Sequence, residues 1–203
     1  MSDLIAGRYR PVAPLPAIGG VARELAVDQV ADHRVAVARI AAGDGTGAVD
    51  RHLRAVQGVR HSCLAPVLDV APAEDGVVIH VEAQADGPLL DGAILSQAGM
   101  LLVGADVAEA LAALHAAGHA HGGLAPDAVV LDATGRPVVM GAGLAAARAL
   151  ADGAAAPTPA DDMRALGAIL YTLITGTAPA TPPAAPMTLA ADICLLYTSD
   201  AAD

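Results

Sequence analysis

The chain of 203 residues contains no lysine, no asparagine, no phenylalanine and no tryptophan. Its eleven Lys+Arg residues are all arginines, so chemistry that needs a lysine amine or an asparagine side-chain amide is excluded. Aromatic residues make up 1% of the chain and hydrophobic residues 55%, so we expect a core of alanine, valine, leucine and isoleucine. These small side chains bury little area each, which predicts a modest stability margin.

Charge and cysteine content favour a cytoplasmic location. The formal net charge is −11 at pH 7, so we expect no nucleic acid and no anionic membrane surface as partner, because both attract clustered basic side chains. Cys63 and Cys194 are far apart and give no disulfide framework. The longest apolar run, residues 100–118, is interrupted by Asp106 and Glu109, so we expect no membrane span. The start of the chain lacks the apolar core of a signal peptide.

The apolar pattern predicts a strand-rich first part and a helical second part. Alternating or β-branched segments between turn-forming residues predict strands, and apolar residues at helical spacing predict helices. Alanine- and glycine-rich residues 144–156 predict a flexible surface loop. This order of elements predicts an α+β fold, which favours two lobes. The expected strands cover residues 8–15, 23–29, 34–40, 65–70 and 77–82, a short hairpin covers 128–141, and the expected helices cover 48–59, 100–117 and 161–175.

The last residues, CLLYTSDAAD at 194–203, resemble the translated read-through of a common transposon sequencing adapter. We exclude them from fold reasoning, so Cys194 falls outside the protein's own sequence. We expect that sequence to run to Ile193 as a fragment of a longer chain.

Several short motifs, in order and correctly spaced over about residues 7–180, resemble those of bacterial eukaryotic-type Ser/Thr protein kinases. They are GRYR, LPAIGGVARELAVD, VAVAR, RHSCLAPVLDV, ALHAAGHAHGGLAPDAVVLD, PVVMGAGLA and DDMRALGAILYTLITGTAP. The resemblance implies a bilobal protein-kinase-like fold. A β-rich N-lobe would cover residues 1–84, and an incomplete helical C-lobe would cover residues 85–193.

The same resemblance implies that the catalytic residues are missing. Phosphoryl transfer in this family depends on positioning and charge neutralisation, so each lost group has a definite duty. The glycine-rich loop has Pro16, Ile18 and Val21 at its glycine positions, and only Gly19 and Gly20 remain. The other degenerate positions are Ala38 for the strand lysine, His52 for the helix glutamate, Gly123 for the catalytic aspartate, Ala125 for the loop lysine, Ala128 for the magnesium-binding asparagine and Gly141 for the D-F-G aspartate.

The positions that still match the family pattern have structural roles. His121 is expected to pack and hydrogen-bond beneath the activation segment, and Asp162 to hold the catalytic-loop backbone. Leu124 and Pro126 are expected to keep the shape of that loop. A scaffold kept while the chemistry is lost is the pattern of a folded non-catalytic module.

Nucleotide binding without catalysis stays an open alternative. By resemblance, Gly19 and Gly20 would approach the phosphates, and Ala36 and Val130 would sandwich the adenine. The Glu82 carbonyl and the Gln84 N–H would face the base at the hinge. Against this, Arg23 stands where the family has a small apolar residue over the adenine. We therefore expect neither ATP nor magnesium as a required cofactor.

Two sharper metal hypotheses are disfavoured by the sequence. Asp127 or Asp132 is conceivable as a shifted magnesium ligand, because both lie beside the degenerate loop. His115, His119 and His121 have a spacing that suggests zinc, but a structural zinc site needs four ligands and no further cysteine or histidine lies nearby. We expect no metal site.

Thr158, between two prolines in the activation-segment region, is the candidate phosphorylation site. By analogy with related bacterial pseudokinases, an active kinase would phosphorylate it and a phosphothreonine-binding, FHA-type protein would then bind. The leading functional hypothesis is a cytoplasmic pseudokinase domain, or the cytosolic part of a membrane-anchored protein, that acts as a regulatory or scaffolding module. The alternatives are a divergent ATP-binding kinase or other phosphoryl or nucleotidyl transferase, and a remnant without a partner.

Overall fold

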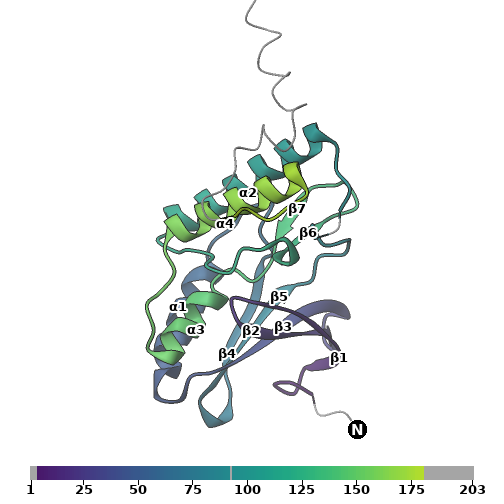
Figure 1. Ribbon diagram of the computed structural model, residues 1–203. Coiled ribbons are helices and arrows are strands. Elements are labelled where there is room, and N and C mark those ends of the chain that lie inside the picture. The colour runs from purple at the N-terminus through teal and green to yellow at the C-terminus, as the bar shows by residue number, and fades with distance from the viewer. Residues whose placement is uncertain (1–3, 92, 181–203) are drawn as a thin grey trace, which may run out of the picture.

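The computed structural model describes residues 4–91 and 93–180 and shows an α+β fold (Figure 1). A five-stranded antiparallel sheet is followed by a largely helical part with one short hairpin. The expected α+β class is therefore confirmed. The adapter-like tail at 194–203 and the expected boundary at Ile193 lie outside the described residues.

The five expected strands of the first part are all present. Their order in the sheet is β1-β2-β3-β5-β4, so β1 and β4 form its two edges. The register places Arg23 opposite Ala38, and Ala38 opposite His80 on the next strand. The strands are β1 (Tyr9–Ile18), β2 (Val21–Asp28), β3 (His33–Ala41), β4 (Val67–Pro72) and β5 (Val77–Ala83), and 3₁₀ turns lie at η1 (Gly43–Gly45) and η2 (Glu74–Gly76).

Helix α1 (Thr46–Gln57) and helix α3 (Leu144–Asp152) lie side by side against the sheet (Figure 1). The helix expected over residues 48–59 is thus confirmed as α1, which buries Val49, Leu53 and Val56. Helix α3 contacts α1 and also β2 and β3, although it is more than a hundred residues away from β2 in the chain.

Helix α3 corrects the expectation of a flexible loop over residues 144–156. Alanine has the highest helix propensity, and the segment contains alanine and leucine up to Asp152. Gly153 then ends the helix with a positive φ of 65°, the conformation typical of a glycine C-cap. The helix buries Leu144, Ala146 and Ala147, so low sequence complexity here produces a packed element.

The second part pairs two long helices, as expected from their apolar spacing. Helix α2 (Gln97–Ala116) packs against helix α4 (Pro159–Thr175), and the hairpin of β6 (Val129–Leu131) and β7 (Pro137–Val139) lies beside them after the turn η3 (Pro126–Ala128) (Figure 1). By length and composition α2 is apolar enough to cross a membrane, although core helices of soluble proteins share these properties, and 33% of it is buried.

One hydrophobic cluster joins the two parts. It contains buried residues of the sheet, such as Ile18 and Ala36, together with Val130 and Met140 of the hairpin region and Ile169 of α4. The core therefore continues across residue 84, and the segments that meet there form the candidate site.

Candidate functional site

The turn between β1 and β2 lies directly on two glycine segments from the second part of the chain. A methyl group added at Gly123 would stand 2.6 Å from the backbone nitrogen of Gly19, and one added at Gly141 would stand 2.7 Å from Cγ2 of Ile18. A methyl group on Gly19 would meet Cβ of Ala145 at 2.5 Å. These distances leave no room for a side chain at these three glycines, because Cβ atoms essentially never approach other heavy atoms below 3.0 Å.

Ile18 fills the space between the turn and the glycine segments. It is 1% exposed, and it belongs to the hydrophobic cluster that also contains Leu124 and Met140. Arg148 of α3 holds the turn from the other side, because its Nη1 donates to the Gly20 carbonyl oxygen at 2.9 Å. The β1–β2 turn is therefore fixed by apolar packing, by backbone contact and by a hydrogen bond.

A buried ion pair lies next to Ile18. Arg23 Nη2 donates to Glu82 Oε1 at 2.7 Å, with side chains that are 4% and 1% exposed. The second carboxylate oxygen of Glu82 accepts the Gly141 N–H at 2.8 Å, so one side chain joins β2, β5 and the segment after β7. Burial raises the pKa of the Glu82 carboxyl, while Arg23 and the Gly141 N–H act in the opposite direction.

His80, two residues before Glu82, is buried with an unpaired polar atom. Its side chain is 1% exposed, and its Nε2 has no hydrogen-bond partner among the described residues, as is also true of Arg23 Nε. Burial, with a contribution from the positive charge of Arg23, lowers the pKa of His80 to about 3. The imidazole is therefore neutral at physiological pH.

Asp162 organises the loop around His121. Its carboxylate accepts the backbone N–H of His121 at 2.8 Å and of Gly122 at 2.7 Å, and His115 Nε2 lies 2.8 Å from the same carboxylate. The contact between Asp162 and the loop backbone that the sequence analysis expected is present in the structure. Asp162 is 1% exposed, so it is a buried acceptor at the start of α4.

The orientation of His121 follows from its two ring nitrogens. Nδ1 accepts the Gly123 N–H at 3.2 Å, so Nε2 carries the proton and donates to the Met140 carbonyl oxygen at 2.8 Å. Burial lowers the pKa of this imidazole, which is fully buried. Leu124 is also buried, and Pro126 begins the turn η3, so the loop is anchored at both ends.

Other positions where the sequence departs from the family pattern lie in the core or on α1. Ala38 on β3 and Ala128 in η3 are buried in the core. His52 on α1 contacts the Gly143 carbonyl oxygen through Nε2 at 3.1 Å, and burial lowers its pKa. Its ring meets the His119 ring edge to face, with centroids 5.3 Å apart.

The metal hypotheses gain no support from the geometry. Within residues 4–91 and 93–180, no group of three or more metal-ligating side chains is found. His115 and His121 contact different atoms, Asp162 and Met140. The carboxylate of Asp132 caps the β6–β7 turn, because it accepts hydrogen bonds from Thr134 and from the Arg136 N–H. These bonds lower the pKa of Asp132.

Of the residues expected to contact a nucleotide, Ala36, Glu82 and Val130 are buried, whereas Gly19 and Gln84 are half-buried and Gly20 is exposed. Ala36 is 1% exposed and Val130 is 3% exposed, and both belong to the main hydrophobic cluster. The Glu82 side chain makes the ion pair described above. Gln84 donates to the Ala85 carbonyl oxygen at 2.8 Å, and Gly19 and Gly20 form the turn that lies on Gly123.

Thr158 is the N-cap of α4. It is exposed, and its hydroxyl donates to Asp161 Oδ2 at 2.7 Å and accepts the Asp161 N–H at 3.4 Å. Asp161 in turn accepts the Thr158 backbone N–H, which completes a capping box. The Thr158 hydrogen bonds and Arg164 lower the pKa of Asp161 to about 2.

The ion pair of Arg23 with Glu82 was not predicted from the sequence, although the sequence analysis placed Arg23 over the expected adenine position. Arg23 on β2 and Glu82 on β5 were the available signal, because a charged side chain in a buried strand needs a counter-charge. A search against protein-family models finds no match for this chain, and a search of curated proteins finds none either.

Proposed function

We propose that this chain is a protein-kinase-like pseudokinase domain that works without nucleotide, as a regulatory or scaffolding module that binds other proteins. The observation that carries the proposal is the packing of Ile18 and of the Arg23–Glu82 pair between the sheet and the glycine segments. In a kinase-like arrangement, that is the place where the adenine and the phosphates would lie. Protein side chains and backbone occupy it here.

The order of elements supports the kinase-like part of the proposal. A five-stranded antiparallel sheet with one helix, α1, is followed by a long helix, a loop with His121, a short hairpin and the helix α4. Asp162 at the start of α4 reaches back to the loop backbone, as the family resemblance implies. A bilobal arrangement with a β-rich first lobe is part of this proposal.

The chemistry supports the non-catalytic part. Phosphoryl transfer requires cations and carboxylates around the phosphates, and Ala38, Gly123, Ala128 and Gly141 supply none of them. The exposed Thr158 remains a candidate phosphorylation site for a partner kinase, with subsequent binding by a phosphothreonine-binding protein. Because its hydroxyl caps α4, phosphorylation would break the bond to Asp161 and place two negative groups together.

Thermal unfolding with and without millimolar Mg·ATP tests the proposal. A nucleotide present at about 100 times its dissociation constant adds roughly 2.7 kcal/mol to the free energy of unfolding. This raises Tm by about 5–10 °C for a chain of this size. We expect no shift. The comparison variant is Arg23→Val/Glu82→Met, which removes both buried charges and tests whether the ion pair alone excludes the base. A magnesium-dependent shift in the unaltered chain would overturn the proposal and favour a divergent enzyme.

A further inference from the structure

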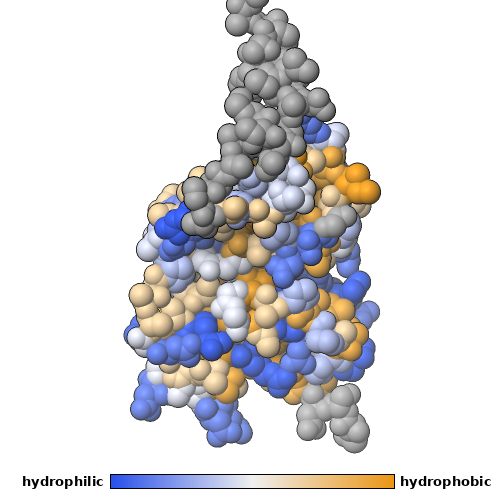
Figure 2. Space-filling model, viewed as in Figure 1, coloured by the Kyte–Doolittle hydropathy of each residue, from blue (hydrophilic) through white to orange (hydrophobic). Residues whose placement is uncertain are grey.

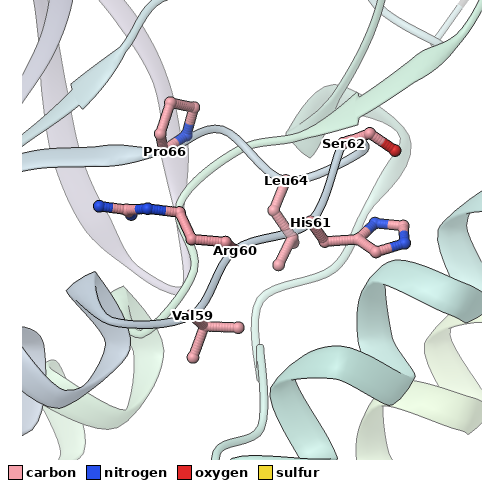
Figure 3. A pocket seen from close by; sticks show the side chains of 6 residues that line it. All are labelled: Val59, Arg60, His61, Ser62, Leu64 and Pro66. Carbon is pink, nitrogen blue, oxygen red and sulfur yellow. The ribbon is translucent and has the colours of Figure 1, made fainter.

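A pocket of about 440 Å³ lies in the loop between α1 and β4, away from the candidate site (Figure 3). We call it the loop pocket. Its lining is mostly apolar, and the basic side chains Arg60 and His61 extend to opposite sides of it (Figure 3). The loop pocket is lined by Val59, Arg60, His61, Ser62, Leu64 and Pro66.

The floor of the loop pocket is rigid. Leu64 is 6% exposed, its N–H donates to the His61 carbonyl oxygen at 3.1 Å, and it forms a bridge with Val139. The next residue, Ala65, donates its N–H to the Val139 carbonyl oxygen at 2.9 Å. Val59 and Pro66 complete the apolar surface of the pocket.

The rim of the loop pocket carries two arginines that form no ion pair within 4.0 Å among the described residues. Seven of the eleven arginines pair with a carboxylate within 4.0 Å, but Arg60 and Arg136 do not pair with any in residues 4–91 and 93–180. Arg136 reaches the rim because its Nη2 donates to Ser62 Oγ at 2.9 Å. Both arginines are exposed. In a chain of net charge −11, two unpaired guanidinium groups around one apolar pocket are a local exception.

His61 adds a third donor. Its Nδ1 accepts the Cys63 N–H at 3.2 Å, so the neutral ring carries its proton on Nε2. The described carboxylate that faces this atom is Glu109 of α2, at 4.0 Å, which is beyond hydrogen-bond distance, and its side chain is 74% exposed. The Nε2–H is therefore available to an incoming acceptor.

We propose that the loop pocket binds an acidic segment of a partner protein, with one aliphatic side chain on the apolar floor and flanking carboxylates on Arg60, Arg136 and His61. Guanidinium groups bind carboxylates with directed hydrogen bonds, and an apolar anchor with a charged rim is the usual organisation of a peptide site. A basic or uncharged segment would leave the arginines unpaired. This inference names the chemistry of the partner that the proposed scaffolding function requires, and it rests on that function only in assuming a protein partner.

Fluorescence anisotropy of the whole chain with three labelled peptides of about nine residues tests the inference. The first peptide has a central leucine among aspartates, the second has glycine in place of the leucine, and the third has lysines in place of the aspartates. We expect saturable binding of the first peptide, at least about tenfold weaker binding of the other two, and weakening by added salt.

Charge-reversal variants locate the binding. The double variant Arg60→Glu/Arg136→Glu should weaken binding of the acidic leucine peptide by about tenfold or more, whereas the same change at Arg10 should leave it nearly unchanged. Arg10→Glu is the control for each single reversal, Arg60→Glu and Arg136→Glu, because Arg10 is exposed, lacks a described carboxylate partner and lies on β1, at the sheet edge opposite β4. Glu109→Gln should strengthen binding, because it removes a carboxylate that faces His61.

Either of two results would overturn the inference: no saturable binding of the acidic leucine peptide, or equal weakening by the Arg10 variant and by the double variant. Peptide binding and nucleotide binding are measured separately. A shift with Mg·ATP would therefore overturn the proposed function while leaving the peptide result valid, and a failed peptide titration would leave the nucleotide result unaffected.

Discussion

Replacement of Glu82 by methionine is expected to destabilise the chain strongly. Replacement of both Arg23 and Glu82 by methionine is expected to recover much of the lost free energy of unfolding. The pair is almost completely buried, and Glu82 also accepts the Gly141 N–H. Glu82→Met leaves a guanidinium in the core with one remaining bond, a long contact of 3.4 Å to the Pro16 carbonyl oxygen. Arg23→Met/Glu82→Met removes both charges and leaves only the Gly141 N–H unpaired.

The magnitudes follow from the burial. Breaking a buried ion pair costs about 3–5 kcal/mol, because the surviving charge is uncompensated. In the double variant, the unpaired Gly141 N–H costs about 1–3 kcal/mol, and apolar replacement of a buried pair is often neutral or stabilising by about 1–4 kcal/mol. We therefore expect the double variant within about 3 kcal/mol of the unaltered chain. At about 2–4 °C per kcal/mol, Glu82→Met alone should lower Tm by roughly 6–20 °C.

Urea unfolding followed by circular dichroism at neutral pH measures these differences. The pair Arg34–Asp86 is a matched control, because its atoms are 2.9 Å apart but its side chains are 55% and 73% exposed. Asp86→Met should change the free energy of unfolding by less than about 1 kcal/mol. If Arg23→Met/Glu82→Met is as unstable as the sum of its two single variants, the two charges are not coupled and the reasoning is refuted.

Three further changes test other parts of the site. The pKa of His80 is lowered from 6.5 to about 3, so its stabilising contribution is complete well above pH 6.5 and is lost as pH falls towards 3. Between pH 7.5 and 5.5, the free energy of unfolding of the unaltered chain should fall by about 1 kcal/mol more than that of His80→Leu in urea unfolding. Asp162→Asn should lower the free energy of unfolding by about 2–4 kcal/mol, because the single amide oxygen cannot replace a carboxylate that accepts two backbone N–H groups. Calorimetry measures this change, and an unchanged Tm would contradict the expectation. Thr158→Ala should cost about 1 kcal/mol through loss of the N-cap, whereas Thr158→Ser should cost little, and equal stability of the two variants would argue against the cap.

Local sequence patterns were sufficient for most elements of the fold. Alternation of apolar residues gave the strands β1 to β5, and helical spacing gave α1, α2 and α4. The acidic residues at the start of α4 marked its N-terminus, where the capping box with Thr158 is found. These features depend on neighbours within a few residues, so they can be predicted from a single sequence.

Features that depend on distant contacts were not predictable in the same way. Helix α3 was missed because alanine- and glycine-rich segments are also typical of flexible loops, and its packing against α1 supports the helix here. The Arg23–Glu82 pair depends on the register of β2, β3 and β5, which no local pattern fixes. Likewise, Arg136 reaches Ser62 only because the β6–β7 turn folds back on that loop.

The close approach of the β1–β2 turn to Gly123 has a consequence for the history of this protein. Under the proposed function, Gly123 stands where an active ancestor had its aspartate, yet a Cβ at that position would now lie 2.6 Å from the Gly19 nitrogen. The Cβ of an aspartate introduced at this position would therefore collide with the backbone of the turn. A Gly123→Asp substitution alone is therefore expected to displace the β1–β2 turn instead of restoring activity, because the turn fills the space that the aspartate side chain needs.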